Sequence, residues 1–177
     1  MSERILIAGI GNIFFGDDAF GPRVVRELSA RQWPDQVEIA DFGIRGIDLA
    51  FALLDDYRAA IFIDATPRGG EPGTLYLIEV DDVTRAGHGV ASVETHNIDP
   101  AQVLSTVKAY GGTPPPLWVV GCEPGSLEAE SGDVLQLSAP VEAALAGAVN
   151  MVESLVSSIL SPAASTKHSV SRRGQSS

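Results

Sequence analysis

Short apolar runs alternate with amphipathic segments along most of the chain. Runs with the length and apolar character of strands occupy 4–8, 36–40, 59–64, 74–80 and 117–121. Apolar residues recur at three- and four-residue spacing, as on one face of a helix, in 19–31, 47–54, 99–110 and 138–160. This alternation predicts an α/β domain, a three-layer sandwich around a mostly parallel five-stranded sheet. The connection between 59–64 and 74–80 is too short for a helical crossover, so we expect one strand to be antiparallel.

Beyond residue 160 the pattern stops. Segment 161–177 is rich in serine and small residues and offers too little apolar surface to offset the entropy of ordering it. We therefore expect a single domain over 1–160 and a disordered tail over 161–177. Segment 81–98 is polar and without period, and long loops of this kind in compact domains are usually functional or disordered.

Charge and cysteine content narrow the class of protein. The 177 residues carry a formal net charge of −11, which disfavours nucleic acid and anionic membranes as partners. Cys122 is the single cysteine, so an internal disulfide is impossible. The N-terminus does not resemble a signal peptide, and no apolar run approaches the roughly 20 residues that span a bilayer. Together these features predict a cytoplasmic protein.

A glycine-rich loop over 9–21 joins the first strand to the first helix. Such a loop normally presents N–H groups and a positive helix end to an anion. Here Asp17 and Asp18 stand at that end, so the loop favours a cation. A dinucleotide site remains the alternative, and three features oppose it: the two acids, Phe14 where a third glycine would let helix and strand approach, and Asp41 lying about 30 residues past Gly11 instead of about 20.

Three side chains are candidates for a metal site. Asp18 ends the loop after the first strand, Asp64 ends the third strand, and His96 lies in the polar segment before the third helix. In doubly wound sheets these positions face one crevice at the carboxyl ends of the strands. Two carboxylates and one imidazole suit zinc, nickel or cobalt better than magnesium, with coordination positions left open. Each residue also has an ordinary interpretation. Asp18 could be a helix cap, Asp64 a buried carboxylate with a hydrogen-bond partner, and His96 a solvated loop histidine.

The remaining polar residues do not identify a nucleophile. Cys122 is expected to be a buried core thiol, and Ser126 lacks the glycine pattern of a nucleophile elbow. Glu123 and Glu128 are expected to be solvated loop acids. The glycines of Asp41-Phe42-Gly43-Ile44-Arg45-Gly46 permit unusual backbone angles, so this segment is either a plain turn or a flexible wall of the crevice. The catalytic residue is therefore unknown at this point.

Taken together, the motifs resemble those of the hydrogenase maturation endopeptidases. The resemblance runs in order through roughly residues 4–160. It is carried by Gly9-x-Gly11-Asn12, Gly16-Asp17-Asp18-Ala19-Phe20-Gly21, Asp41-x-Gly43-x-x-Gly46, Ile63-Asp64-Ala65, Thr95-His96-Asn97 and Gly121-x-x-Pro124-x-Ser126-Leu127-Glu128. Ala19 departs from the family, in which many members have glycine after the two acids.

This resemblance implies a monomeric α/β protease that removes a C-terminal peptide from the large-subunit precursor of a nickel–iron hydrogenase after nickel insertion. It places Asp18, Asp64 and His96 as ligands of a divalent metal, most simply the nickel that the substrate supplies, with zinc or cadmium as substitutes. The candidate substrate-binding residues are Asn12, Asp17, Asp41, Gly43 and Gly46, although Asp17 could also be only a helix-end acid. Two alternatives remain: a nucleotide-dependent oxidoreductase, and a non-catalytic chaperone of the metal-loaded subunit.

Overall fold

The structure is a computed structural model that describes residues 2–80, 98–125 and 136–161. The described part contains five strands and four α-helices, preceded at the first helix by a 3₁₀ turn. Their order is β1 (Ile5–Ile10), η1 (Gly16–Ala19), α1 (Phe20–Ser29), β2 (Val37–Gly43), α2 (Gly46–Ala52), β3 (Ala59–Ala65), β4 (Leu75–Val80), α3 (Pro100–Ala109), β5 (Leu117–Cys122) and α4 (Ala139–Leu160). The predicted tail, 161–177, lies almost entirely outside the described residues.

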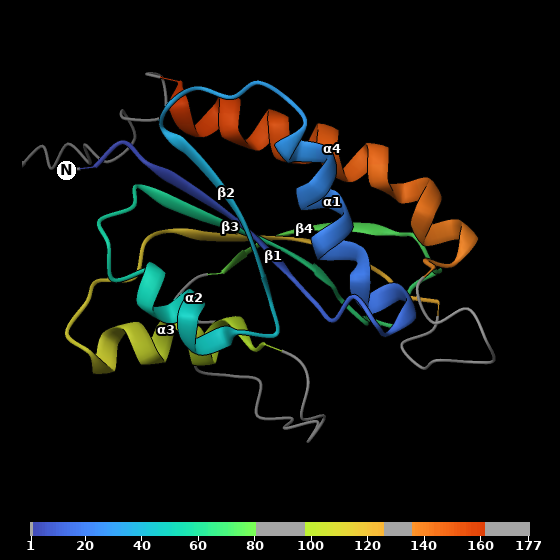
Figure 1. Ribbon diagram of the computed structural model, residues 1–177, viewed down its shortest axis with the longest axis horizontal. Helices are drawn as coiled ribbons and strands as arrows, with labels where there is room; N and C mark the ends of the chain where they lie inside the picture. Colours follow the sequence, from blue (N-terminus) through green and yellow to red (C-terminus); the bar gives the residue numbers. More distant parts are fainter. Residues whose placement is uncertain (1, 81–97, 126–135, 162–177) are drawn as a thin grey trace, which may run out of the picture.

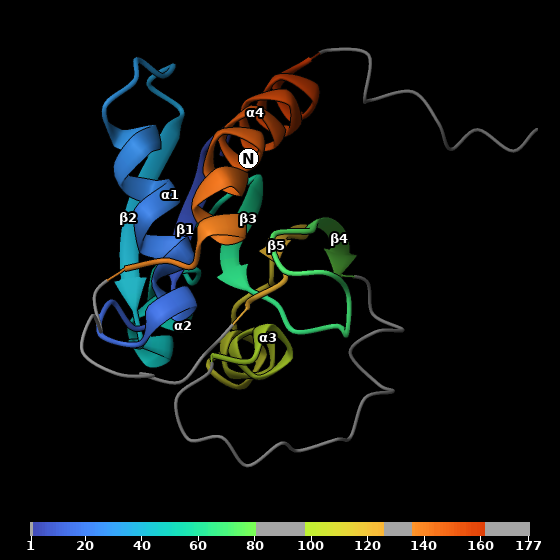
Figure 2. The same cartoon turned by 90° about the vertical axis from the view of Figure 1, so that its right-hand side faces the viewer.

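One mixed sheet organises the molecule. Its strand order is β2-β1-β3-β5-β4, and Figure 2 shows the strands in this order across the view. β1 pairs in parallel with both β2 and β3, and β3 pairs in parallel with β5. β4 forms the antiparallel edge and pairs with β5, which lies between it and β3. The predicted α/β class and the single antiparallel strand are therefore confirmed.

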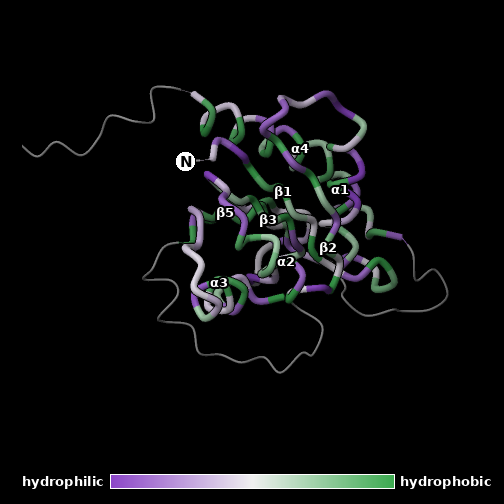
Figure 3. Tube along the Cα trace, turned by 60° about the vertical axis from the view of Figure 1, so that its left-hand side comes forward, coloured by the Kyte–Doolittle hydropathy of each residue, from purple (hydrophilic) through white to green (hydrophobic). Residues whose placement is uncertain are grey.

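Two hydrophobic cores cover the two faces of the sheet. Figure 1 shows α1 and α4 on one side and α2 and α3 on the other. Successive side chains of β1 point into opposite cores. Ile5 and Ile7 pack under α1 and α4, whereas Leu6 and Ala8 pack under α2 and α3. All four side chains are fully buried, as the all-apolar run predicts for a central parallel strand. The apolar interior of the sheet is visible in Figure 3.

Helix α4 corrects one expectation. It has 22 residues and a mean hydropathy of 1.5, so by length and composition it is long and apolar enough to cross a membrane. The sequence analysis had found no such segment. In the structure Val141, Ala148 and Val152 are buried in the core shared with α1 and the sheet. Part of its apolar surface is therefore packed against α1 and the sheet.

Element boundaries move by a few residues from the prediction. The largest change is at β2, which extends to Gly43 and so includes Asp41. The first helix begins later than predicted because Gly16–Ala19 forms a separate 3₁₀ turn. That turn places both acids of the glycine-rich loop inside the structure, where their partners decide their roles.

Candidate functional site

The carboxyl ends of β1 and β3 meet where the order of the strands reverses direction. Within the sheet, β2 lies on one side of β1, and β3, the next strand in the chain, lies on the other side of β1. Ligand sites of open α/β sheets lie at this switch point. Asp64 lies near the end of β3 and Asp18 lies in η1, which follows β1 and contacts β3. The structure therefore brings these two predicted metal ligands to one edge of the sheet.

Asp64 is a strongly perturbed acid at this edge. Burial and then the negative charge of Asp18 raise the pKa of Asp64 well above its usual value, and the Ala65 N–H only partly opposes them. A carboxylate in low dielectric beside a like charge is costly to ionise. A nearby cation would offset both costs, and the predicted metal site at this edge remains a prediction.

Asp18 is held by the backbone of its own loop. Its side chain is 6% exposed, and its Oδ2 accepts a hydrogen bond from the Asn12 N–H at 2.7 Å. The Asn12 Oδ1 in turn accepts from the Phe14 N–H at 2.9 Å. The Asn12 side chain thus shapes the loop that supports Asp18. Its predicted role in binding substrate remains a prediction.

Glycines make the close packing of this edge possible. A Cβ on Gly11 would lie 1.8 Å from the Asp18 carbonyl oxygen, and the glycine has a φ of 135°. A Cβ on Gly21 would lie 2.2 Å from the Ile10 oxygen and 2.3 Å from the Ile63 oxygen. The start of α1 therefore rests directly on the ends of β1 and β3. The close helix–strand approach that a glycine at position 14 would have allowed is made instead at Gly21, seven residues later.

The Asp41–Gly46 segment lies beside this loop. Gly43 has a positive φ of 55°, one of the unusual angles that glycine permits, and its carbonyl accepts the Gly11 N–H at 2.9 Å. Asp41 Oδ1 accepts the Gly43 N–H at 2.8 Å and stabilises the turn. Gly46 serves packing instead, since its Cβ would come within 3.3 Å of Ile98. The segment is thus an ordered wall next to the site.

Asp17 has a different environment from the one predicted. It is 1% exposed, and it bridges two distant segments. Its Oδ2 accepts from the Gly125 N–H at 2.7 Å and the Ser138 hydroxyl at 2.8 Å, and its Oδ1 accepts from the Ser138 N–H at 2.6 Å. Asp17 is therefore not only an acid at a helix end. Its three hydrogen bonds favour a structural role, in which it links two distant segments, over a role in binding substrate.

Glu123 was expected to be solvated, and this was wrong. It is 5% exposed, and its carboxylate accepts the Arg68 N–H and the Tyr76 hydroxyl, each at 2.8 Å. Burial alone would raise the pKa of Glu123, but these donors and the Gly69 N–H outweigh it and lower the pKa. Its side chain anchors the loop between β3 and β4. No signal within one sequence distinguishes such an acid from a solvated one.

The predicted core thiol is confirmed. Cys122 is fully buried, and burial followed by the charges of Asp17 and Glu123 raises its pKa to about 11. A thiol with this pKa is almost entirely protonated at neutral pH and is a poor nucleophile.

His96, Ser126 and Glu128 lie outside the described residues. Within ranges 2–80, 98–125 and 136–161, no group of three histidine, cysteine, aspartate or glutamate side chains is arranged to hold a metal ion. The described edge supplies two carboxylates, Asp18 and Asp64, and the imidazole of His96 remains a prediction from the sequence.

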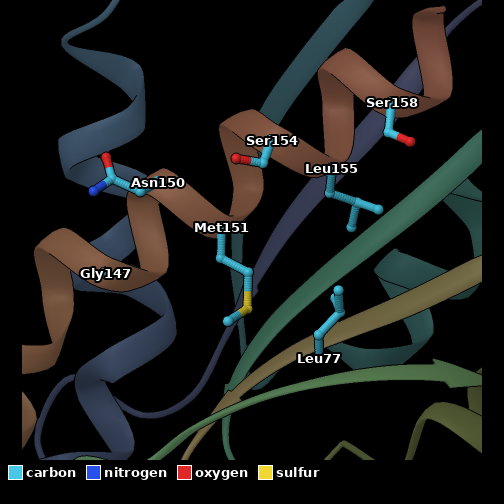
Figure 4. A pocket seen from close by; sticks show the side chains of 7 residues that line it. All are labelled: Leu77, Gly147, Asn150, Met151, Ser154, Leu155 and Ser158. Carbon is cyan, nitrogen blue, oxygen red and sulfur yellow. The ribbon is translucent and has the colours of Figure 1, made fainter.

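A shallow groove of about 490 Å³ lies elsewhere, between β4 and α4. Figure 4 shows the side chains that line it. They are Leu77, Gly147, Asn150, Met151, Ser154, Leu155 and Ser158. None of these residues is an acid or a histidine, so the groove lacks the chemistry of the β1–β3 edge.

Comparison with known proteins agrees with the family resemblance found in the sequence. Residues 22–155 match the family model described as hydrogenase maturation protease. The chain is 36% identical over 150 residues to the hydrogenase expression/formation protein HupD of Bradyrhizobium diazoefficiens, covering 84% of this chain and 76% of the relative. It is 33% identical over 143 residues to the hydrogenase 2 maturation protease of Escherichia coli, covering 80% and 86%.

Solved structures agree. A hydrogenase 2 maturation peptidase from a Thaumarchaeota archaeon superposes with a TM-score of 0.66 at 36% identity, covering 88% of this chain and 99% of that one. The maturating endopeptidase HybD of Escherichia coli superposes with a TM-score of 0.71 at 33% identity, covering 88% and 93%.

Proposed function

Because the chain belongs to the hydrogenase maturation protease family, we propose that it removes the C-terminal extension from the nickel-loaded large-subunit precursor of a nickel–iron hydrogenase. The family and the enzyme class, a maturation endopeptidase, agree with the expectation from the sequence motifs. The nucleotide-dependent alternative has no support from these relatives. The observation that carries the proposal is the pairing of Asp18 and Asp64 at the switch point, where the charge of one disfavours the charge of the other.

The donor set fits a divalent metal that arrives with the substrate. Asp18 and Asp64 offer carboxylate oxygens at one edge, and burial together with the charge of Asp18 makes Asp64 costly to keep charged without a cation. His96 would complete the set with a nitrogen ligand, which suits nickel, zinc or cadmium better than magnesium. The nickel is then part of the substrate, and its capture by these residues would restrict cleavage to loaded precursor. A metal held there could also polarise the scissile carbonyl as a Lewis acid.

The chain's own residues prepare the edge for this substrate. The Asn12 N–H fixes one oxygen of Asp18, and Gly11 and Gly21 let the loop and α1 approach the strand ends. The wall formed by Asp41 and Gly43 borders the loop, where these two residues could contact the substrate chain. The general base or nucleophile is not assigned.

Several companion expectations belong to the same proposal. We infer that the protein acts as a monomer in the cytoplasm, without nucleic acid or membrane as a partner. The inferences on compartment, nucleic acid and membrane rest on the net charge of −11 and the single buried cysteine, and the inference of a monomer rests on the family. They also assume that residues 1–160 form one domain with 161–177 as a disordered tail.

Nickel dependence tests the proposal. Purified protein is incubated with nickel-loaded precursor and, separately, with the same precursor prepared without nickel. We expect shortening of the loaded precursor only, and loss of that shortening in His96→Ala. Equal shortening of both precursors would contradict nickel-dependent recognition. A stable complex with unshortened loaded precursor would support the chaperone alternative instead.

A further inference from the structure

Large apolar side chains are exposed on two loops and at the start of α2, beside the edge that carries Asp18 and Asp64. We call them the apolar rim. It consists of Ile13, Phe14, Phe15, Ile44 and Ile47. Phe14 is 60% exposed and Ile47 is 69% exposed, although the chain buries comparable side chains throughout both cores. Clustered exposed apolar residues on a folded protein commonly mark a binding surface.

The two halves of the apolar rim are fixed relative to each other. The Gly11 N–H donates to the Gly43 carbonyl at 2.9 Å, which joins the loop after β1 to the loop after β2. Ile13 and Phe14 follow Gly11 closely, and Ile44 follows Gly43 directly. Neighbouring strands thus present their apolar loop residues at the same edge of the sheet.

The apolar rim is also attached to the carboxylate pair. Asn12 binds Asp18 through its N–H and binds the Phe14 N–H through its side chain. The Asp18 N–H donates to the Phe15 carbonyl at 2.9 Å. Phe14 and Asp18 are therefore held in one short, hydrogen-bonded loop.

Other exposed apolar residues have a separate explanation. The rings of Phe51 and Tyr110 contact each other, with their centroids 5.1 Å apart, and this pair joins α2 to the end of α3. Leu77 lies on the β4 edge and lines the groove against α4. The residues of the apolar rim differ from these because they border the carboxylate pair.

We propose that the apolar rim binds an extended apolar stretch of the precursor, within a few residues of its scissile bond. This inference rests on the proposed function. Phe14 and Asp18 are four positions apart, so their Cα atoms lie at most about 14 Å from each other, a span that an extended peptide covers in about four residues. The net charge of −11 favours a stretch without acidic residues. The occupant is thus one segment of the substrate, bound before cleavage.

Kinetics with nickel-loaded precursor test this assignment. Phe14→Ala and Ile47→Ala should each raise KM about tenfold, because each removes a large apolar contact with the substrate. KM should rise while kcat stays at the wild-type value, as expected for a contact made equally in the ground and transition states. The melting temperature should stay at the wild-type value, since both side chains are mainly exposed. Leu77→Ala, a half-exposed residue away from the site, is the matched control and should leave KM unchanged.

Unchanged KM in both rim variants would overturn the assignment, and so would an equal rise in Leu77→Ala. A wild-type dimer that Phe14→Ala dissociates without any change in KM would show that a second copy of the chain occupies the rim, which also overturns it. Failure of the proposed function has a different signature: wild-type protein leaves loaded precursor at full length. Direct titration with precursor then still tests the rim, where Phe14→Ala should weaken binding about tenfold and unweakened binding refutes it.

Discussion

Replacing Asp17 with alanine should destabilise the fold far more than its position in a loop suggests. The carboxylate accepts three hydrogen bonds from Gly125 and Ser138, residues more than 100 positions away in the sequence. Alanine leaves two N–H groups and one hydroxyl without this acceptor. At about 1 kcal/mol for each partly buried donor, the free energy of unfolding should fall by about 3 kcal/mol. That is a large part of the stability of a typical domain.

Ser138→Ala provides the matched comparison. It removes only the hydroxyl donor and leaves both N–H groups bound to Asp17. Although Ser138 is the N-cap residue of α4, its side chain makes no capping hydrogen bond, so the variant isolates the contact with Asp17. The expected loss is about 1 kcal/mol.

Urea unfolding followed by circular dichroism measures both variants. With the denaturant slope unchanged, the shift in midpoint gives the change in free energy. If Asp17 bridges the two segments, the free energy of unfolding should be highest for wild type, lower for Ser138→Ala and clearly lowest for Asp17→Ala. If Asp17→Ala unfolds within about 0.5 kcal/mol of wild type, the value typical of surface changes, the bridge does not contribute to stability.

Two further substitutions probe the edge itself. Asp64→Asn should stabilise the free protein at neutral pH by about 1 to 2 kcal/mol while abolishing processing, the trade-off expected at a functional site. Since the pKa of Asp64 is raised in the folded state, its contribution to stability should decline as pH rises from near 3.8 through the folded pKa, so the stability of Asp64→Asn relative to wild type should increase across this range. An unchanged pH profile would show that Asp64 is not perturbed. Gly21→Ala should cost about 3 kcal/mol in urea unfolding, because the new Cβ collides with two carbonyl oxygens. Gly147→Ala, which meets only the flexible end of Leu75, is its control, and equal losses would contradict the close helix–strand contact.

Much of the fold was predictable because it depends on local pattern. The apolar run of β1 and the stripe of α4 identify a buried strand and a packed helix, and the short connection before β4 predicts an antiparallel strand. The end of β2 was less predictable, because Gly43 pairs with the loop after β1 through a bond that local sequence does not reveal.

The site was predictable only where the topology determines it. Asp18 and Asp64 follow adjacent parallel strands, so the switch-point rule brings them together. Asp17 and Glu123 could not be assigned in this way. Their partners lie far along the chain, and a buried carboxylate with several donors has the same sequence signature as a solvated one.

Intact mass measurement of the precursor tests the central claim, that the Asp18–Asp64 edge processes nickel-loaded substrate. Loaded precursor is incubated with wild-type protein and, in parallel, with Asp64→Asn shown to be folded by its unfolding curve. The account predicts a shortened precursor and a released C-terminal peptide with wild type, and full-length precursor with Asp64→Asn. Shortening by Asp64→Asn at the wild-type rate would contradict it.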